Sequence, residues 1–164
     1  MQNSYDTPRL VLRQLTLADA IFIRELVNTP AWLRFIGNRN VNNTEDALSY
    51  TSKILDTPRA SYWVVQLKES NSPIGVITLI QRDYLDHPDI GFAFLPAYAG
   101  QGYAKEAAGL VLNDAIKEQP KVLAITVKEN APSIKLLEKL GLVFDKELLQ
   151  DEEHLLLYTY NKLP

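Results

Sequence analysis

Cysteine is absent from this chain of 164 residues. The absence excludes disulfide bonds, thiolate metal sites and a cysteine nucleophile, and it suits a reducing compartment. No segment approaches the ~20 consecutive apolar residues that a membrane-spanning helix needs. The opening residues, Met1 to Asp6, show neither the basic nor the apolar region of a secretory signal. We therefore expect a cytoplasmic protein with no membrane partner.

Basic residues are too few and too scattered to form a nucleic-acid-binding face. There are 17 Lys and Arg against 20 Asp and Glu, which gives a formal net charge of −3. A general nucleic-acid-binding protein needs a basic surface that displaces counterions from phosphate, so no nucleic-acid partner is expected. A local pocket for one polyphosphate ligand remains compatible with this charge. No spacing of His, Asp and Glu predicts a metal site.

The remaining composition is that of an ordinary globular protein, with 46% hydrophobic and 23% charged residues. The length fits one domain, and the sequence has no internal repeat or linker, so residues 1–164 are expected to form a single domain. Hydrophobic periodicity and turn residues predict an α/β (α+β) domain with a mixed sheet. The predicted strands are 9–13, 62–67, 74–80, 89–95, 122–127, 142–149 and 155–160, and the predicted helices are 16–27, 44–55, a helix from 103 that includes 104–115, and 132–140.

Residues typical of helix ends mark several of these boundaries. Thr16 to Asp19 resembles a capping box, and Thr44 is the expected N-cap of the second helix. Asn130 stands near the start of the last helix, and Gly141 is its expected C′ residue.

The segment from Ile90 to Ala104 leads a strand through a tight glycine turn into a helix. The first N–H groups of a helix lack internal partners and lie at the positive end of the macrodipole, so they bind phosphate well. Gly100 and Gly102 would let the backbone approach such an anion closely. An ordinary strand-to-helix turn explains this pattern equally well. It is not a Walker loop, because Tyr103 follows the second glycine, and Lys105 stands where a Rossmann fingerprint needs a small residue.

Three motifs occur in a fixed order along the chain. Residues 7–13 read Thr-Pro-Arg-Leu-Val-Leu-Arg, residues 96–107 read Pro-x-x-x-Gly-x-Gly-Tyr-Ala-x-Glu-Ala, and residues 130–142 read Asn-x-x-Ser-x-x-x-x-Glu-Lys-x-Gly-Leu. Together they resemble the GNAT superfamily of N-acetyltransferases, and most closely its ribosomal-protein N-acetyltransferase-like (RimJ/RimL) branch. Ala99 departs from the family, which often has Arg, Gln or Trp there, and Leu142 replaces the usual Phe.

The resemblance implies a mixed, mostly antiparallel sheet of about seven strands flanked by about four helices. It also implies transfer of an acetyl group from acetyl-CoA, a co-substrate, to a primary amine of a protein N-terminus or a small molecule. A non-catalytic acyl-CoA-binding regulatory module and an interaction domain that has lost the ligand are the alternatives. The acceptor and the oligomeric state, monomer or homodimer, stay open. The residues implied in cofactor binding are Phe92, Phe94, Leu95, Gly100, Gln101, Gly102, Tyr103, Ala104 and Asn130.

Asp89 is the candidate general base. An aliphatic amine has a pKa near 10.4, so it arrives as an ammonium and must lose a proton before it attacks a thioester. Strand alternation places Asp89 on one face with Gly91 and Ala93, two small residues that leave room for an acceptor. Several GNAT enzymes have Glu at the matching place, and the shorter Asp favours a bridging water. A polar residue that closes a turn is an equal alternative.

Ser133 is the candidate that stabilises or protonates the departing CoA thiolate, because Leu137 stands where many GNAT enzymes have a Tyr. A local hydrogen bond is its ordinary interpretation. Asn130 either contacts the pantetheine arm or caps the helix. For the acceptor, Arg39 is a candidate ligand of a carboxylate and Trp32 a candidate wall of the cleft. A solvated loop arginine and a core aromatic are the corresponding ordinary interpretations.

Overall fold

The computed structural model describes residues 1–162. Its strands are β1 (Ser4–Asp6), β2 (Leu10–Gln14), β3 (Ala60–Leu67), β4 (Pro73–Ile80), β5 (Asp89–Phe94), β6 (Lys121–Thr126), β7 (Val143–Gln150) and β8 (Glu153–Asn161). Its helices are α1 (Ala20–Val27), α2 (Pro30–Phe35), α3 (Thr44–Leu55), α4 (Tyr103–Glu118) and α5 (Ala131–Lys139), with short 3₁₀ turns η1 (Leu17–Asp19) and η2 (Pro96–Tyr98).

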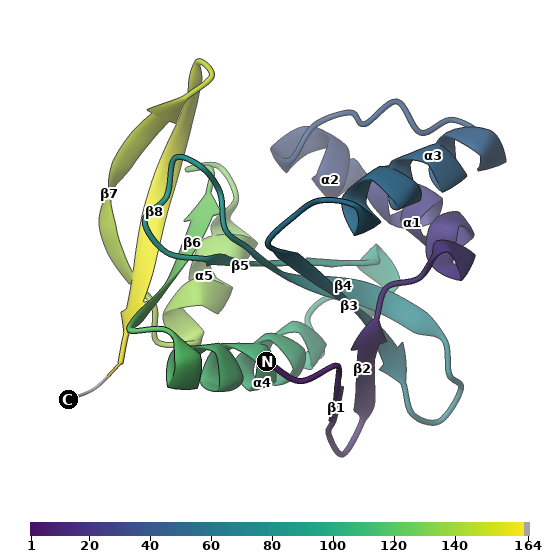
Figure 1. Ribbon diagram of the computed structural model, residues 1–164, viewed down its shortest axis with the longest axis horizontal. Helices are drawn as coiled ribbons and strands as arrows, with labels where there is room; N and C mark the ends of the chain where they lie inside the picture. Colours follow the sequence, from purple (N-terminus) through teal and green to yellow (C-terminus); the bar gives the residue numbers. More distant parts are fainter. Residues whose placement is uncertain (163–164) are drawn as a thin grey trace.

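The eight strands form one sheet in the order β1-β2-β3-β4-β5-β6-β8-β7. Every neighbouring pair is antiparallel except β5 and β6, which are parallel. Figure 1 shows α1, α2 and α3 gathered on one side of β3 and β4, while α4 crosses the other side. The predicted α/β class with a mixed, mostly antiparallel sheet is confirmed. Residues 1–162 contain one strand and one α-helix more than the predicted numbers of about seven and four.

The two extra elements, β1 and α2, are too short to show a hydrophobic period. In β1 only Tyr5 is buried, and three residues are too few to show a repeated alternation of apolar and polar side chains. Helix α2 has six residues and begins with Pro30 directly after its N-cap, Thr29, whose side chain accepts a hydrogen bond from the Trp32 amide at 3.4 Å. Thr-Pro is a known helix-start signal, and it could have indicated α2 from the sequence.

Two helix starts differ from the sequence prediction. The capping box is present, since the Thr16 amide donates to Asp19 at 2.9 Å, but it opens η1 before α1 begins. Helix α3 is capped by Asn43 and not by Thr44: Oδ1 of Asn43 accepts from the Asp46 amide at 2.8 Å. Asn is as good an N-cap as Thr or better, and the chain takes the residue one position earlier.

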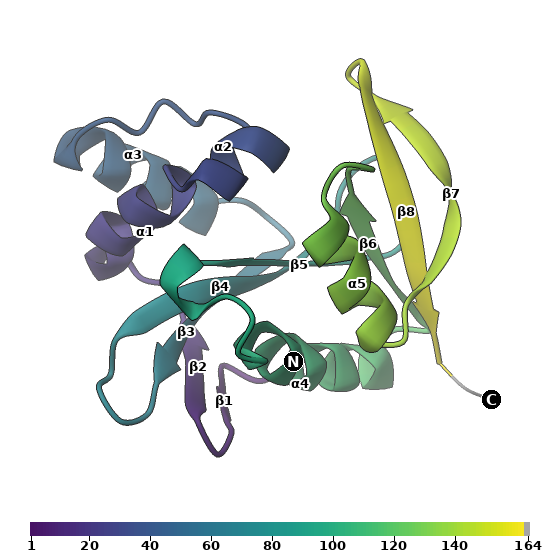
Figure 2. The same cartoon turned by 180° about the vertical axis from the view of Figure 1, so that it is seen from behind.

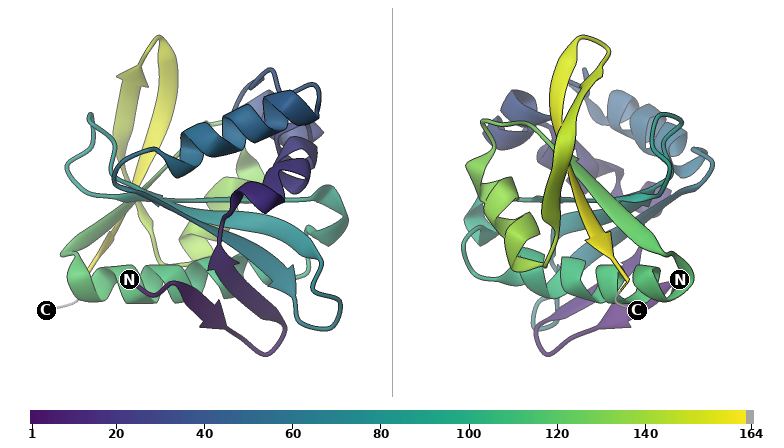
Figure 3. Two further views of the ribbon diagram at one scale, coloured as in Figure 1. Left: turned by 45° about the vertical axis from the view of Figure 1, so that its right-hand side comes forward. Right: turned by 90° about the vertical axis from the view of Figure 1, so that its left-hand side faces the viewer.

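Alternating side chains of β3 and β4 supply two buried clusters. Figures 2 and 3 show the helices α1 and α4 on opposite faces of these strands. Val64 and Val76 pack in the cluster that contains α1, whereas Trp63, Val65 and Ile77 pack in the cluster that contains α4. Fully burying such a side chain stabilises the fold by roughly 1.5–3 kcal/mol. The two-sided burial explains why these strands read as nearly continuous apolar runs.

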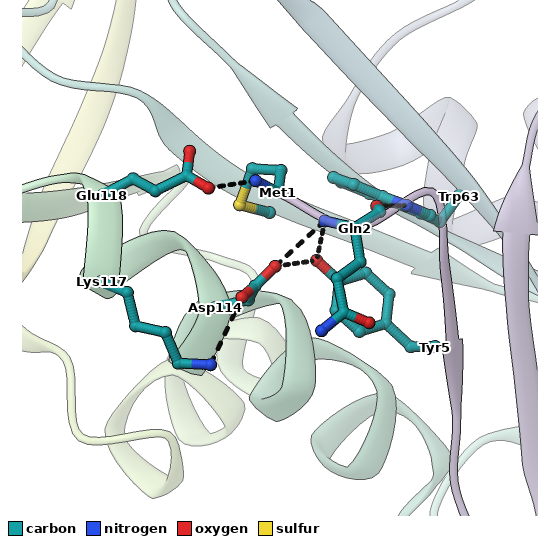
Figure 4. A network of polar contacts seen from close by, with 7 residues as sticks. All are labelled: Met1, Gln2, Tyr5, Trp63, Asp114, Lys117 and Glu118. Atoms are coloured by element: carbon teal, nitrogen blue, oxygen red, sulfur yellow. Dashed lines mark hydrogen bonds and ion pairs between the residues drawn. The ribbon is translucent and has the colours of Figure 1, made fainter.

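A polar network attaches the N-terminal segment to the second half of α4 (Figure 4). The Tyr5 hydroxyl donates to Asp114 Oδ2 at 2.7 Å, and the Gln2 amide donates to the same oxygen at 3.1 Å. Trp63 Nε1 donates to the Gln2 carbonyl at 3.2 Å. Burial and the hydrogen bond to Asp114 raise the pKa of Tyr5, so this hydroxyl stays a donor. The network fixes α4 against β1 and β3 and so helps to set the position of the turn that precedes the helix.

Among residues 1–162, no helix is long and apolar enough to cross a membrane.

Candidate active site

The strands β5 and β6 separate soon after they meet. Within the described residues, their only paired positions are Asp89 and Leu123, where the Leu123 amide donates to the Pro88 carbonyl at 2.9 Å. Beyond this point β5 continues its pairing with β4 as far as Phe94, while β6 pairs only with β8. One edge of β5 is therefore left without a strand partner beyond Asp89.

Strand alternation identifies the backbone groups on this open edge. The Leu95 amide donates to the Ile74 carbonyl at 2.9 Å, which places the hydrogen-bonding groups of Leu95 and Ala93 toward β4. The N–H and C=O groups of Phe92 and Phe94 consequently face the gap. Of the residues implied in cofactor binding, Phe92 and Phe94 thus present their backbone groups to the gap, and the Leu95 amide does not.

The glycine turn has the backbone conformation that its sequence requires. Gly100 and Gly102 have φ values of +74° and +81°, in the left-handed region that favours glycine. The first bond of α4 runs from the Glu106 amide to the Gly102 carbonyl at 3.0 Å. In the part of the chain that the structure describes, the amides of Tyr103 and Ala104 donate to no protein acceptor. A Cβ atom added at Gly100 would meet nothing within 4 Å, so the turn opens onto free space.

A cavity of about 520 Å³ begins at the gap between β5 and β6 and extends beneath α1, α2 and α3 to the turn between β7 and β8. Six of the predicted site residues line it: Asp89, Phe92, Asn130, Ser133, Arg39 and Trp32. The remaining ones do not line it, because Phe94, Leu95 and the turn 100–104 lie farther along β5 and at the start of α4. The predicted residues therefore form two groups, one around the cavity and one at the glycine turn.

Asp89 lies at the start of β5 with only 2% of its surface exposed. Its Oδ1 atom accepts a hydrogen bond from Nε of Arg82 at 2.7 Å. Burial raises the pKa of the Asp89 carboxyl, and the nearby Arg82 guanidinium opposes this rise without cancelling it. Thr78 occupies part of the room expected beside Gly91, since its Oγ1 would lie 2.6 Å from a Cβ there.

The sequence analysis missed Arg82 as a partner of Asp89. Arg82 lies two residues beyond the end of β4, and Ile80 of that strand is paired with Asp89. The antiparallel register of the predicted strands 74–80 and 89–95 was the signal that could have found it, because residues just after one strand lie beside the start of the next.

Asn130 and Ser133 meet at the first turn of α5. Oδ1 of Asn130 accepts from the Ser133 amide at 3.3 Å, so Asn130 is the N-cap of this helix. The Nδ2 group of Asn130 donates to no atom of residues 1–162, and it remains free to donate to a ligand. Ser133 is half-buried at the cavity wall, one helical turn before the fully buried Leu137.

The part of the cavity lined by α2 and α3 is largely aromatic. The expected Trp32 lines it together with Phe35, Tyr50, Tyr62 and Tyr84. The Trp32 Nε1 atom is buried without a hydrogen-bond partner in the described chain. The charged residues on this side are Arg39, the pair Arg82 and Asp89, and Asp151 and Glu153 of the hairpin turn. Burial raises the pKa of Tyr62, and likewise that of Tyr84.

Comparisons with known proteins identify the family of this chain. A family model for an acetyltransferase (GNAT) domain matches residues 9–143. The chain belongs to the GNAT acetyltransferase family. The matched range begins at the first motif, contains the whole glycine turn and α5, and ends in β7. Within residues 1–162 of this GNAT domain, no three His, Cys, Asp or Glu residues are grouped to hold a metal ion.

Relatives and solved structures agree with this family. The uncharacterized N-acetyltransferase YnaD of Bacillus subtilis (strain 168) is 28% identical over 139 residues, which are 83% of this chain and 80% of that protein. A GNAT-family acetyltransferase from Bacillus anthracis superposes with a TM-score of 0.80 at 23% identity, over 96% of this chain and 98% of that one. The spermidine N-acetyltransferase from Vibrio cholerae in complex with CoA and spermine gives 0.78 at 19% identity, over 94% and 96%. At these identities the two structures show the shared fold.

Proposed function

We propose that this GNAT acetyltransferase transfers the acetyl group of acetyl-CoA to a primary amine. The observation that carries the proposal is the open edge of β5. It lies between the glycine turn, whose first helical amides are free, and the cavity that contains Asp89. An extended pantetheine arm pairs with the groups of Phe92 and Phe94, and its pyrophosphate binds the turn at Gly100 and Gly102. A spermidine N-acetyltransferase of similar fold forms a complex with CoA, which supports the assignment of CoA to this site.

In the proposed reaction Asp89 accepts the proton that the incoming ammonium must lose, directly or through one water. One carboxylate oxygen of Asp89 is held by Arg82, and the other oxygen is left to accept the proton. The amine lone pair then attacks the thioester carbonyl, the C–S bond breaks and the CoA thiolate leaves, and the nitrogen gives up its second proton, which ends on the thiolate, as it becomes an amide nitrogen. The Ser133 hydroxyl, at the cavity wall, stabilises or protonates that thiolate.

The acceptor enters from the side lined by α2 and the hairpin turn. Trp32 and the neighbouring tyrosines provide apolar walls, and Arg39 lies at the wall as the candidate ligand of an acceptor carboxylate. A protein N-terminus and a small-molecule amine both meet these requirements. The motifs at residues 7–13 and 130–142 support membership of the RimJ/RimL branch, and we infer that residues 1–164 act as one catalytic domain.

The test is release of free thiol from acetyl-CoA in the presence of a panel of primary amines. The panel contains short peptides with different N-terminal residues, polyamines and amino acids. Amine-dependent thiol release supports the proposal. CoA binding without thiol release for any amine would favour the regulatory module, and absence of CoA binding would remove the cofactor assignment.

A further inference from the structure

Arg9, directly before β2, contacts the glycine turn although 92 residues separate it from Gln101. Its Nη1 atom donates to the Gln101 carbonyl at 3.0 Å, and its guanidinium lies 4.3 Å from the centre of the Tyr103 ring. Its Nε and Nη2 atoms lie 2.8 and 2.6 Å from Oε2 of Glu106, in the first turn of α4. The first and second motifs of the sequence therefore meet at this arginine.

The bond to Gln101 sets the direction of one peptide unit in the turn. In a trans peptide the C=O and N–H groups point in opposite directions. Because the Gln101 carbonyl points toward Arg9, the Gly102 amide of the same peptide points away from it. The adjacent Gly100 has a positive φ of +74° and nothing within 4 Å of its Cβ position. Gly-rich backbone of this kind has several accessible orientations, and the contact with Arg9 selects one of them.

Glu106 holds the side chain of Arg9 in place. The Thr7 hydroxyl donates to Oε1 of Glu106 at 2.6 Å, and the Arg9 backbone amide approaches the same oxygen at 3.3 Å. Partial burial works against ionisation of Glu106, but the bonds from Thr7 and Arg9 lower its pKa overall. Nε and Nη1 of Arg9 thus donate to protein oxygens and Nη2 is paired with Glu106, which suits a brace for the turn better than a ligand of phosphate.

We propose that Arg9 is a positioning residue for the cofactor turn: it holds the Gln101 peptide so that the Gly102 amide faces the bound anion. The inference rests on the proposed function, in which this turn binds the CoA pyrophosphate. A planar guanidinium can make the three directed contacts at once, and an ammonium cannot. The geometry of the group, beyond its charge, is what the turn requires.

The test compares Arg9→Met and Arg9→Lys with the wild type in calorimetric titrations with CoA. Both variants should bind CoA more weakly by about tenfold, the order expected for loss of a charge-assisted hydrogen bond. Pantetheine, which lacks the pyrophosphate, should bind all three proteins alike in an NMR titration. The matched control is Arg13→Met, because the partly exposed Arg13 also pairs with a carboxylate, that of the buried Asp19 at 2.7 Å, away from the turn.

Wild-type CoA affinity in Arg9→Lys would overturn the inference, since charge alone would then suffice. Equal weakening in Arg13→Met, or equal loss of pantetheine binding, would also overturn it by indicating general damage to the fold. If the wild type itself binds no CoA, the proposed function fails together with this inference. If the wild type binds CoA and both Arg9 variants match it, only this inference fails.

Discussion

The Nε atom of Arg82 lies 2.7 Å from Oδ1 of Asp89, yet the arginine side chain is 35% exposed and the aspartate side chain only 2%. The carboxylate therefore carries most of the desolvation, and its pKa is raised although an opposite charge is in contact with it. A raised pKa makes a carboxylate a stronger proton acceptor. The balance between burial and Arg82 sets how basic Asp89 is.

Replacing Asp89 by Asn should lower turnover by about 10²–10⁴ near neutral pH, because the amide keeps the shape and cannot accept the proton. The loss should become smaller as pH rises, since more of the amine is then already deprotonated. Steady-state rates across pH measure this, and the rise in Tm with acetyl-CoA serves as the control for cofactor binding. Full activity near pH 7 would show that Asp89 is not the base, and Glu152 and Glu153 would be tested next.

Replacing Arg82 by Met should shift the pH profile of kcat/KM. The arginine lowers the pKa of Asp89 against the effect of burial, so its removal raises that pKa further. More of the carboxyl is then protonated at a given pH, and the rising limb of the profile should move to higher pH. Arg82→Lys, which keeps the charge, should show a smaller shift. An unmoved limb with lower activity would mean that Arg82 acts only on structure.

Replacing Gly102 by Val should abolish the stabilisation by acetyl-CoA. A β-branched residue at a φ of +81° is strained, and its Cβ would lie 3.4 Å from Nη2 of Arg9. At 100 times its Kd, a ligand that binds only the native state adds about 2.7 kcal/mol of stability. Melting curves with and without acetyl-CoA measure the shift.

The matched control for this variant is Gly109→Ala, farther along α4. A Cβ at Gly109 meets only Leu140 Cδ2 at 3.8 Å, an ordinary contact. This variant should keep the full shift in melting temperature. A full shift in Gly102→Val as well would place the cofactor elsewhere.

Replacing Ser133 by Ala should lower turnover by more than about tenfold while CoA affinity changes little. The cap of α5 uses the backbone amide of Ser133, which the substitution retains. Single-turnover rates and CoA titrations separate the two quantities. Asn130→Ala is the informative comparison, because it removes the cap and should reduce stability by ~1 kcal/mol. Wild-type turnover in Ser133→Ala would leave solvent as the proton donor to the thiolate.

The sequence was most informative where one residue type alone satisfies a local requirement. Gly100 and Gly102 were identified as a special turn because few other residues adopt positive φ, and both have it. The helix predicted to include residues 104–115 was recognisable in the same way from its periodic apolar residues, and Ala107, Val111 and Ala115 are buried. Such features depend on a few neighbouring residues, so the sequence contains them in full.

Features that depend on register between distant segments could not be read in this way. The burial of Asp89 follows from the position of β5 between β4 and β6, and nothing in the Asp86 to Asp89 turn indicates it. The contact between Arg9 and Gln101 likewise requires that β2 and α4 lie side by side. Only the tertiary packing brings Arg9 close to Gln101 and buries Asp89. A single sequence gives the residue types without the distances between them.

The position of the open edge of β5 also limits what can pair with it. Unpaired strand edges usually lie at the rims of sheets, where they can recruit strands of other molecules. Here an unpaired edge lies in the middle of the sheet, with β4 bonded on one side and Leu123 of β6 bonded to Pro88 at its foot. The gap between β5 and β6 closes where the two strands meet, so a second sheet has no room to add successive strands there. A single extended chain is the largest partner that such an edge admits.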